Sequence, residues 1–276
     1  MAEQELFLNL GAWMERSRAN GPGERFSRPR TTSEIARAVG VHPNTVRLYE
    51  AWGFLPPIPR SPGGYRLFTE QHLEQMRLAR LSLHGSWPGP NIRRSALDLV
   101  RQAASGDLQG ALEMARRHLA LVQAERSQAE AAAQVLEAWA QGATFEAPGP
   151  PRQVREVAAL LDVTADMLRN WERNGLIHVP RDPRNRYRRY GPYEIDRLRI
   201  IRMLIRVGYS TMAVLRMLLQ FDQGRRCELR EVLDTPRPDE DILSASDRWL
   251  STLAEQESRA RRIVAQLLAM VELEAI

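Results

Sequence analysis

The sequence contains two copies of one segment, separated by a constant 122 positions. "HPNTVRLYEAWGFL" at residues 42–55 is matched by "TADMLRNWERNGLI" at residues 164–177. The match keeps one register, without a gap, from about Glu34 to about Leu97 of the first copy. A repeat of this length indicates that the chain is built from two copies of one structural unit. The identical pairs include Arg47/Arg169, Glu50/Glu172, Gly53/Gly175, Tyr65/Tyr187 and Arg66/Arg188.

Each copy begins with two short helices joined by a tight turn. In the first copy, "TSEIARAVG" predicts a helix with Thr32 or Ser33 as its N-cap, because a hydroxyl there can accept a hydrogen bond from a free backbone N–H. "HPNTVRLYEAWG" predicts the second helix, since Pro43 is tolerated in a first turn and Gly53 can end a helix. Two such helices are typical of a helix-turn-helix.

A proline- and glycine-rich segment follows these helices, and a long helix follows each copy. "FLPPIPRSPGGYRLFT" predicts a loop or two short strands closed at "SPGG", which would form a wing. Apolar residues recur at alternating steps of three and four over about residues 107–141 and again over about 246–273. This spacing favours a coiled coil, and packing of each helix on a globular core is the alternative.

The sequence excludes several classes of protein. Cys227 is the only cysteine among 276 residues, which rules out an internal disulfide framework and any multi-thiolate metal or iron–sulfur site. No apolar run is long enough to span a membrane, and the N-terminus does not have the pattern of a secretory signal. Phosphate-binding loops, nucleophile elbows and paired metal-ligand motifs are absent. We therefore expect no enzyme activity, no cofactor and no metal site.

The charge suits a polyanionic partner. The formal net charge is +5, and all 39 basic residues are arginines. A GC-rich genome would explain the choice of arginine over lysine. Whatever its origin, every cation is a planar guanidinium, which can contact a phosphate or a guanine through two hydrogen bonds at once.

These segments resemble the MerR family of bacterial transcription regulators. The resemblance is carried by "TVRLYEAWGFLPPIPRSPGGYRLFT" in the first copy and by the more diverged "MLRNWERNGLIHVPRDPRNRYRRYG" in the second. It implies a mainly α fold, with two winged helix-turn-helix DNA-binding domains joined by long helices that form an antiparallel coiled coil. Members of the family are homodimers, so two heads in one chain imply a single-chain pseudo-dimer that acts as a monomer.

The linker between the copies fits an antiparallel coil. A helix of about 34 residues is about 50 Å long, whereas a ten-residue linker reaches at most about 35 Å. An antiparallel pair places the end of the first long helix beside the start of the second, so this short linker is sufficient. The expected divisions are an N-terminal helix and basic arm (1–30), the first winged domain (31–106), the first coil helix (107–141), the linker (142–151), the second winged domain (152–222), a connector (223–245) and the second coil helix (246–276).

The second helix of each copy is expected to enter the major groove of DNA. Arg47 and Arg169 lie on the exposed faces of these helices, where a guanidinium can reach a guanine or a phosphate. The first helical turn enters the groove in this type of docking. The first-turn residues expected to contact DNA are Asn44 and Thr45 in the first copy and Thr164 and Asp166 in the second. Plain helix capping is the alternative role, chiefly for Thr164 and Asp166.

The remaining DNA-contacting residues follow from the resemblance. Tyr49 matches a position that contacts phosphate in the family, and Trp171 replaces it in the second copy with an indole that can donate but not accept. Five arginines crowd nine residues of the second wing, where phosphates would neutralise them, and a solvated charged hairpin is the alternative. The wing residues expected to face the DNA backbone are Arg60, Tyr65, Arg66, Arg184, Arg186, Tyr187, Arg188 and Arg189.

Together these features predict a sequence-specific DNA-binding transcription regulator in the cytoplasm, associated with the nucleoid. Its expected target is an imperfect inverted repeat in double-stranded DNA, which it distorts, with RNA polymerase as a further partner and no membrane. The alternatives are an architectural DNA-binding protein of low sequence specificity, a coiled-coil scaffold for protein interactions, and a ligand sensor.

Overall fold

A computed structural model describes residues 28–85, 89–236 and 248–274 of the chain. Residues 1–27 of the predicted N-terminal helix and arm, and residues 237–245 of the predicted connector, lie outside the described residues. The described part is mainly helical, as the sequence predicts, and its extended segments form only isolated β-bridges. None of the described helices combines the length and the apolar character needed to cross a bilayer.

The chain divides into two compact units. The first unit comprises residues 1–84, 94–118 and 259–276, and the second comprises residues 85–93 and 119–258. Each unit therefore combines one copy of the repeat with parts of the two long helices, α6 (Leu108–Ala140) and α12 (Trp249–Glu274).

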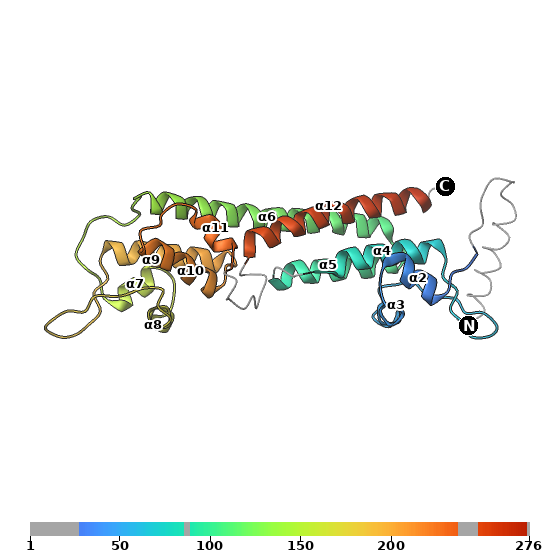
Figure 1. Ribbon diagram of the computed structural model, residues 1–276, viewed down its shortest axis with the longest axis horizontal. Coiled ribbons are helices and arrows are strands. Elements are labelled where there is room, and N and C mark those ends of the chain that lie inside the picture. The colour runs from blue at the N-terminus through green and yellow to red at the C-terminus, as the bar shows by residue number, and fades with distance from the viewer. Residues whose placement is uncertain (1–27, 86–88, 237–247, 275–276) are drawn as a thin grey trace. The chain divides into compact units, whose positions relative to one another are not determined.

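The first unit contains the first head, which we define as α2 (Thr32–Val39), α3 (Pro43–Ala51) and α4 (Glu70–Leu83). In this head α2 contacts both α3 and α4, as Figure 1 shows. The helix α5 (Gly89–Ala104) follows, and its residues from Arg94 onward belong to this unit. The core is formed by apolar residues of all these helices together with the beginning of α6 and the end of α12.

The N-cap of α2 is Thr31, so the prediction of Thr32 or Ser33 is wrong. The Thr31 hydroxyl accepts a hydrogen bond from the backbone N–H of Glu34 at 3.3 Å, and the Glu34 carboxylate accepts one from the backbone N–H of Thr31 at 2.7 Å. This reciprocal capping box needs an acid three residues after the cap, and Thr31 is the hydroxyl residue at that distance from Glu34.

A glycine ends α3 and α8 in the same way. Gly53, just beyond α3, has a φ of 72°, and Gly175, just beyond α8, has a φ of 79°. Both values lie in the left-handed region, where a residue with a Cβ is strained. The sequence prediction that Gly53 terminates the second helix is confirmed at this position.

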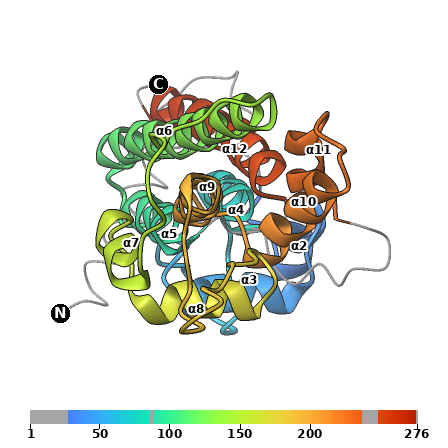
Figure 2. The same ribbon diagram turned by 90° about the vertical axis from the view of Figure 1, so that its left-hand side faces the viewer.

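The second unit contains the second head, which we define as α7 (Val154–Leu160), α8 (Ala165–Arg173) and α9 (Pro192–Arg206). Figure 2 looks along α9, with α7, α8 and α10 (Thr211–Asp222) arranged around it. The burial of α9 agrees with this central position, since seven of its fifteen residues are buried. The short helix α11 (Leu229–Asp234) packs against α10.

The two heads repeat individual contacts as well as helices. Gln75 of α4 donates hydrogen bonds to the backbone carbonyls of Phe54 and Val100, at 2.9 and 3.0 Å. Arg197, the residue 122 positions later, donates to the carbonyl of Leu176 at 2.8 Å and to the Asp222 carboxylate. Phe54 and Leu176 are repeat equivalents, and so are Val100 and Asp222. One buried donor on the third helix therefore joins the same two places in each unit.

Both long helices contribute to the core of each unit. In the first unit, residues of α6 from Leu108 to Ala115 share a hydrophobic cluster with Ile263, Leu267 and Met270 of α12. In the second unit, residues of α6 from Val122 onward share a cluster with the start of α12, from Trp249 to Leu253. An ion pair also joins the helices there, between Arg126 and Glu257 at 2.8 Å.

A buried histidine of α6 makes the first unit sensitive to acid. His118 is 2% exposed, and burial lowers its pKa from 6.5 to about 4. Because the folded pKa lies below the unfolded one, the stabilisation is complete above pH 6.5 and is lost as the pH falls toward 4. The unfolding free energy should decrease by about 3 kcal/mol over that window.

We expect His118→Gln to remove most of this pH dependence. Glutamine does not take up a proton in this range and can still bond to Ser95, whose hydroxyl contacts the His118 ring. Denaturant unfolding at pH 7 and at pH 4.5 would measure the slope, with His178→Gln as the control because His178 is exposed. Burial also lowers the pKa of His72, so some dependence of the unfolding free energy on pH will remain in the variant. Equal slopes for both variants would contradict the prediction.

Candidate nucleic-acid interface

The exposed face of α3 carries the predicted groove-reading residues of the first head. His42 is the N-cap of α3, and its Nδ1 accepts a hydrogen bond from the backbone N–H of Asn44 at 3.2 Å. The Asn44 side chain in turn accepts a hydrogen bond from Arg47 Nη1 at 2.8 Å. Val46 of the same helix is fully buried and holds α3 on the core. Asn44 and Arg47 therefore lie together on the outer side of the helix, where both remain accessible.

The corresponding face of α8 differs in charge. Thr164 is the N-cap of α8, and its hydroxyl accepts a hydrogen bond from the backbone N–H of Met167 at 3.1 Å. Asp166 takes the place of Asn44, and its carboxylate forms an ion pair with Arg169 at 2.6 Å. The Asp166 side chain is 86% exposed, so the pair contributes little to stability but sets the charge of this surface.

The aromatic residues of the two helices lie on the core side. Tyr49 is 9% exposed and packs edge-to-face on Phe54, and Trp171 is 5% exposed. Burial raises the pKa of Tyr49. Each follows a buried aliphatic residue by one helical turn, Val46 before Tyr49 and Leu168 before Trp171. A role of either aromatic residue at a phosphate stays a prediction.

The first wing segment, residues 54–69, forms a tight turn near its tip. An isolated antiparallel bridge joins Arg60 to Arg66, and the backbone N–H of Gly64 donates to the carbonyl of Ser61 at 2.8 Å. Gly64 has a φ of 80°, which only glycine adopts without strain. Tyr65 is 78% exposed at this tip.

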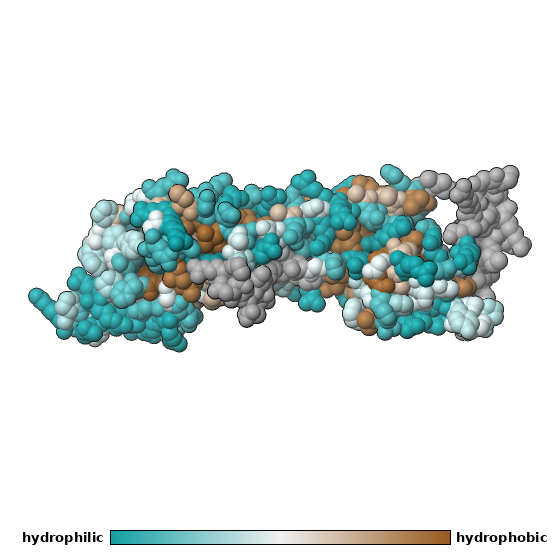
Figure 3. All heavy atoms as spheres, viewed as in Figure 1, coloured by the Kyte–Doolittle hydropathy of each residue, from teal (hydrophilic) through white to brown (hydrophobic). Residues whose placement is uncertain are grey.

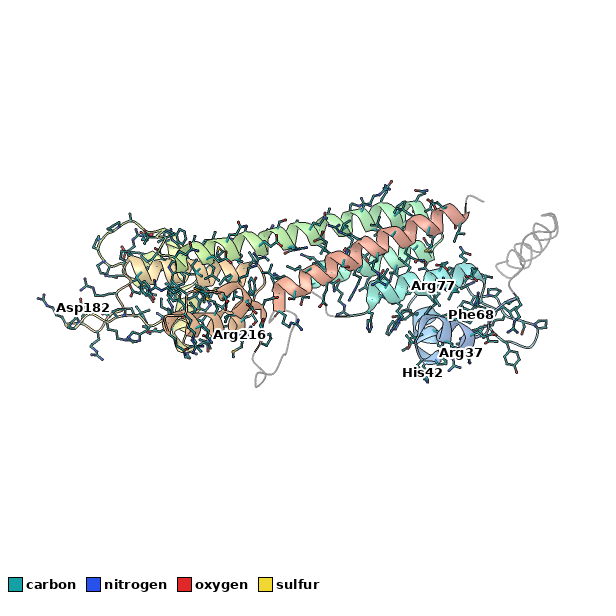
Figure 4. All side chains as sticks on the ribbon, turned by 45° about the horizontal axis from the view of Figure 1, so that its top comes forward. Arg37, His42, Phe68, Arg77, Asp182 and Arg216 are labelled. Carbon is teal, nitrogen blue, oxygen red and sulfur yellow. The ribbon has the colours of Figure 1, made fainter. Side chains whose placement is uncertain are left out.

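The second wing segment, residues 176–191, has a longer tip. Its bridge joins Arg181 to Arg188, which encloses six residues where the first bridge encloses five. Asp182 organises the tip, because its carboxylate accepts from the backbone N–H of Arg184 at 2.8 Å and pairs with Arg189 at 3.3 Å. Figure 4 shows Asp182 in this projecting segment. The second turn, which has Asn185 and Arg186 at the repeat positions of Gly63 and Gly64, therefore contains one more residue than the first.

The two wing segments also differ in polarity. In Figure 3 the surface of the second wing segment is strongly hydrophilic, whereas the tip of the first is close to neutral. Arg184 and Arg186 are exposed, and in the described part of the chain neither forms an ion pair. Tyr187, which is 69% exposed, lies beside them. An exposed cluster of uncompensated guanidinium groups is suited to binding phosphate.

A glutamate in each head, noted in the sequence only as a repeated residue without an assigned role, holds a wing arginine. Glu50 of α3 accepts a hydrogen bond from Arg66 Nε at 2.7 Å, and Glu172 of α8 accepts one from Arg188 Nε at 2.6 Å. Each bond ties the wing segment to the second helix of its own head. The signal is present in the repeat, because both members of each pair recur with the 122-residue spacing.

The second head also places a further arginine near this carboxylate. Arg181 lies 3.6 Å from Glu172, as Arg60 lies 3.9 Å from Glu50 in the first head. In each head these contacts connect the second helix to the wing segment. This architecture, present twice, defines a protein with two helix-turn-helix heads.

Comparison with known families identifies both heads. A family model described as "MerR family regulatory protein" matches residues 31–68, and one described as "MerR HTH family regulatory protein" matches residues 152–220. The chain carries two MerR-family segments in tandem. No solved structure matches the chain.

Curated relatives agree with this family. The HTH-type transcriptional regulator CueR of Escherichia coli O157:H7 is 40% identical over 48 residues, which cover 17% of this chain and 36% of that protein. The ZntR homolog of Haemophilus influenzae is 38% identical over 42 residues, covering 15% and 31%. The mercuric resistance operon regulatory protein of Serratia marcescens is 33% identical over 66 residues, covering 24% and 45%. The chain spans less than half the length of each of these relatives.

Proposed function

We propose that this protein is a cytoplasmic transcription regulator that binds an imperfect inverted repeat in double-stranded DNA through its two heads. The observation that carries the proposal is the duplicated surface of exposed helix face and tied wing arginine, Arg47 with Arg66 and Arg169 with Arg188. A helix face of this kind reads base edges, and a basic wing holds the backbone. The similarity to relatives named as transcriptional regulators supports the same role.

We further propose that one chain supplies both heads of a pseudo-dimer, with α6 and α12 as an antiparallel pair. The order of the shared cores supports this arrangement. The start of α6 meets the end of α12 in the first unit, and the later part of α6 meets the start of α12 in the second. Antiparallel helices produce this order and parallel helices do not. Distortion of the DNA and contact with RNA polymerase belong to the same proposal.

The test is selection of bound duplexes from a random pool, combined with mass measurement of the complex. The proposal predicts a consensus of two unequal half-sites and one chain per duplex. A perfect palindrome occupied by two chains would contradict the pseudo-dimer. A bound pool without any consensus would instead indicate an architectural DNA-binding protein, and failure to bind would leave the scaffold alternative.

We expect Asp166→Asn to strengthen DNA binding several-fold and to change the preferred base in the second half-site. The carboxylate repels phosphate and holds Arg169 in an ion pair. An amide carries no charge to repel phosphate, and it holds the arginine only by a hydrogen bond, as Asn44 does with Arg47. Asn44→Asp makes the reverse exchange in the first head and should weaken binding with a change in the first half-site only. Repeated selection with each variant would measure both effects. A change that appears in the wrong half-site would contradict the assignment of heads to half-sites.

A further inference from the structure

The first unit contains a basic pocket whose lining residues are not among those predicted to contact DNA. The pocket lies between α4 and the middle of α12, against the end of α2, and its volume is about 450 Å³. No carboxylate lines it. Its polar lining consists of Arg77, Arg80, His84, Arg259, Arg262 and Gln266.

Two of the four arginines that line this pocket have no acidic partner within the described residues. Arg77 forms an ion pair with Glu74 of its own helix, and the same glutamate accepts a hydrogen bond from Gln266 at 2.6 Å. Within the described residues, neither Arg80 nor Arg262 takes part in an ion pair. Guanidinium groups that face one pocket repel one another unless an anion lies between them.

In the second head, the arginines equivalent to Arg77 and Arg80 both form ion pairs. Arg199 and Arg202 are the repeat equivalents of Arg77 and Arg80. Arg199 pairs with Glu146 at 2.6 Å, and Arg202 pairs with Asp162 at 3.3 Å.

The first head does not provide the same partner for Arg80. The position equivalent to Asp162 is Gly40, so Arg80 has no acid there, and α12 adds two more arginines to the same place. Glu24 is the repeat equivalent of Glu146 and lies outside the described residues. Because Glu146 pairs with Arg199, Glu24 corresponds to a partner of Arg77 and not of Arg80. Both copies therefore contain this pair of arginines, but only the second has an acid at the position of Asp162.

We propose that this pocket binds a small, soluble, phosphate-bearing molecule with at least two negative charges. Planar guanidinium groups match phosphate oxygens in pairs, and the volume lies in the range of small-ligand sites. The ligand would bridge the head, through Arg80, and the long helix, through Arg262. The proposed ligand is additional to DNA, and its binding does not depend on the proposed DNA-binding role.

A DNA phosphate is a less suitable occupant. Figure 4 shows Arg77 on α4 and His42 at the start of α3 on opposite sides of the first head. A duplex that contacts the exposed face of α3 therefore lies away from the pocket. A small molecule can enter the pocket while the α3 face is either free or bound.

Calorimetric titration of the full chain with pyrophosphate, without DNA, tests the proposal. We expect saturable binding of one pyrophosphate per chain, weakened at least tenfold in the Arg80→Ala/Arg262→Ala variant. The matched control is Arg116→Ala/Arg117→Ala, which removes the same charge from exposed positions of α6 in the same unit. A conservative Arg80→Gln/Arg262→Gln variant shows whether weaker binding reflects the charges or the fold, with circular dichroism as the check.

Two outcomes would overturn the proposal. The first is the absence of saturable binding, and the second is an equal decrease of affinity in the pocket and control variants. If the wild type binds no pyrophosphate and the pocket variant also binds a DNA duplex more weakly, the arginines serve the DNA backbone instead. One site per chain that disappears only when Arg80 and Arg262 are replaced would support it.

Discussion

Replacing Arg184, Arg186 and Arg189 together by alanine will weaken DNA binding on the order of a hundredfold and reduce its dependence on salt. All three side chains are exposed on the second wing segment, and only Arg189 has an acid partner there, Asp182. Each arginine that neutralises a phosphate releases a counterion. The slope of log K against log salt should therefore fall by about 0.9 for each phosphate that is no longer neutralised.

The measurement is a series of binding isotherms at several salt concentrations, on specific and on random duplexes. Because phosphate contacts carry no sequence information, affinity for both duplexes should decrease by a similar factor. The control is Arg116→Ala/Arg117→Ala/Arg206→Ala, which removes the same charge from exposed helix positions. If affinity and slope decrease as much in the control as in the wing variant, the effect is one of net charge and the wing does not hold the backbone.

The wing prediction depends on an asymmetry that the sequence reveals only in part. The density of arginines in the second wing is visible in the sequence, and so is the replacement of the two glycines. The number of residues in the turn is not, because it depends on which residues of the segment bridge across it. The structure pairs Arg181 with Arg188, although the repeat equivalent of Arg60 is Asp182. A shift of one position in pairing cannot be read from turn composition alone.

The helices are predictable because their signals are local. Pro43, Gly53 and the periodic apolar residues define α3 within the segment itself, and the 122-residue repeat transfers that assignment to α8. The N-cap of α2 is predicted wrongly, although its signal is also local. Glu34 identifies Thr31 as the cap, because a capping box has its acid three residues after the cap. The burial of Tyr49 likewise follows from its spacing of three residues from Val46 on one helix face.

Contacts between distant segments cannot be predicted in this way. Gln75 and Arg197 are at equivalent positions of the two copies. One side chain is a neutral amide and the other a charged guanidinium, so the sequence alone suggests no common role. Their shared role depends on carbonyl groups and an acid contributed by other segments. The basic pocket has the same origin, because Arg80 and Arg262 are 182 positions apart in the sequence.

The largest effect on stability is expected from Asp222→Ala, which should lower the unfolding free energy of the second unit by about 3 kcal/mol. Arg197 is only 6% exposed, and its guanidinium donates two hydrogen bonds to the Asp222 carboxylate, at 2.5 and 2.8 Å. Removal of the carboxylate leaves a buried cation without its counter-charge. Thermal unfolding and hydrogen exchange of the α9 and α10 amides would measure the destabilisation.

The matched control is Asp98→Ala in the first unit. Asp98 and Asp222 are almost equally exposed, at 47% and 46%, and each pairs with an arginine. The difference lies in the partner, since Arg101 is 55% exposed and can be solvated when its acid is removed. We expect a destabilisation of no more than about 0.5 kcal/mol for this control. Equal destabilisation in the two variants would show that the burial of Arg197 does not determine the cost.

The repeat itself supplies a way to restore the stability. The first unit holds Gln75 and Val100 at the positions of Arg197 and Asp222, and Gln75 bonds to two backbone carbonyls without any ion pair. We expect Arg197→Gln/Asp222→Val to be nearly as stable as the wild type, because no charge is then left buried and the donor on α9 is kept. Replacement of a buried ion pair by a matched neutral set is often close to neutral in free energy. If the double variant is instead less stable than Asp222→Ala, then the two units do not use this position in equivalent ways, and the Arg197–Asp222 pair is specific to the packing of α10 in the second unit.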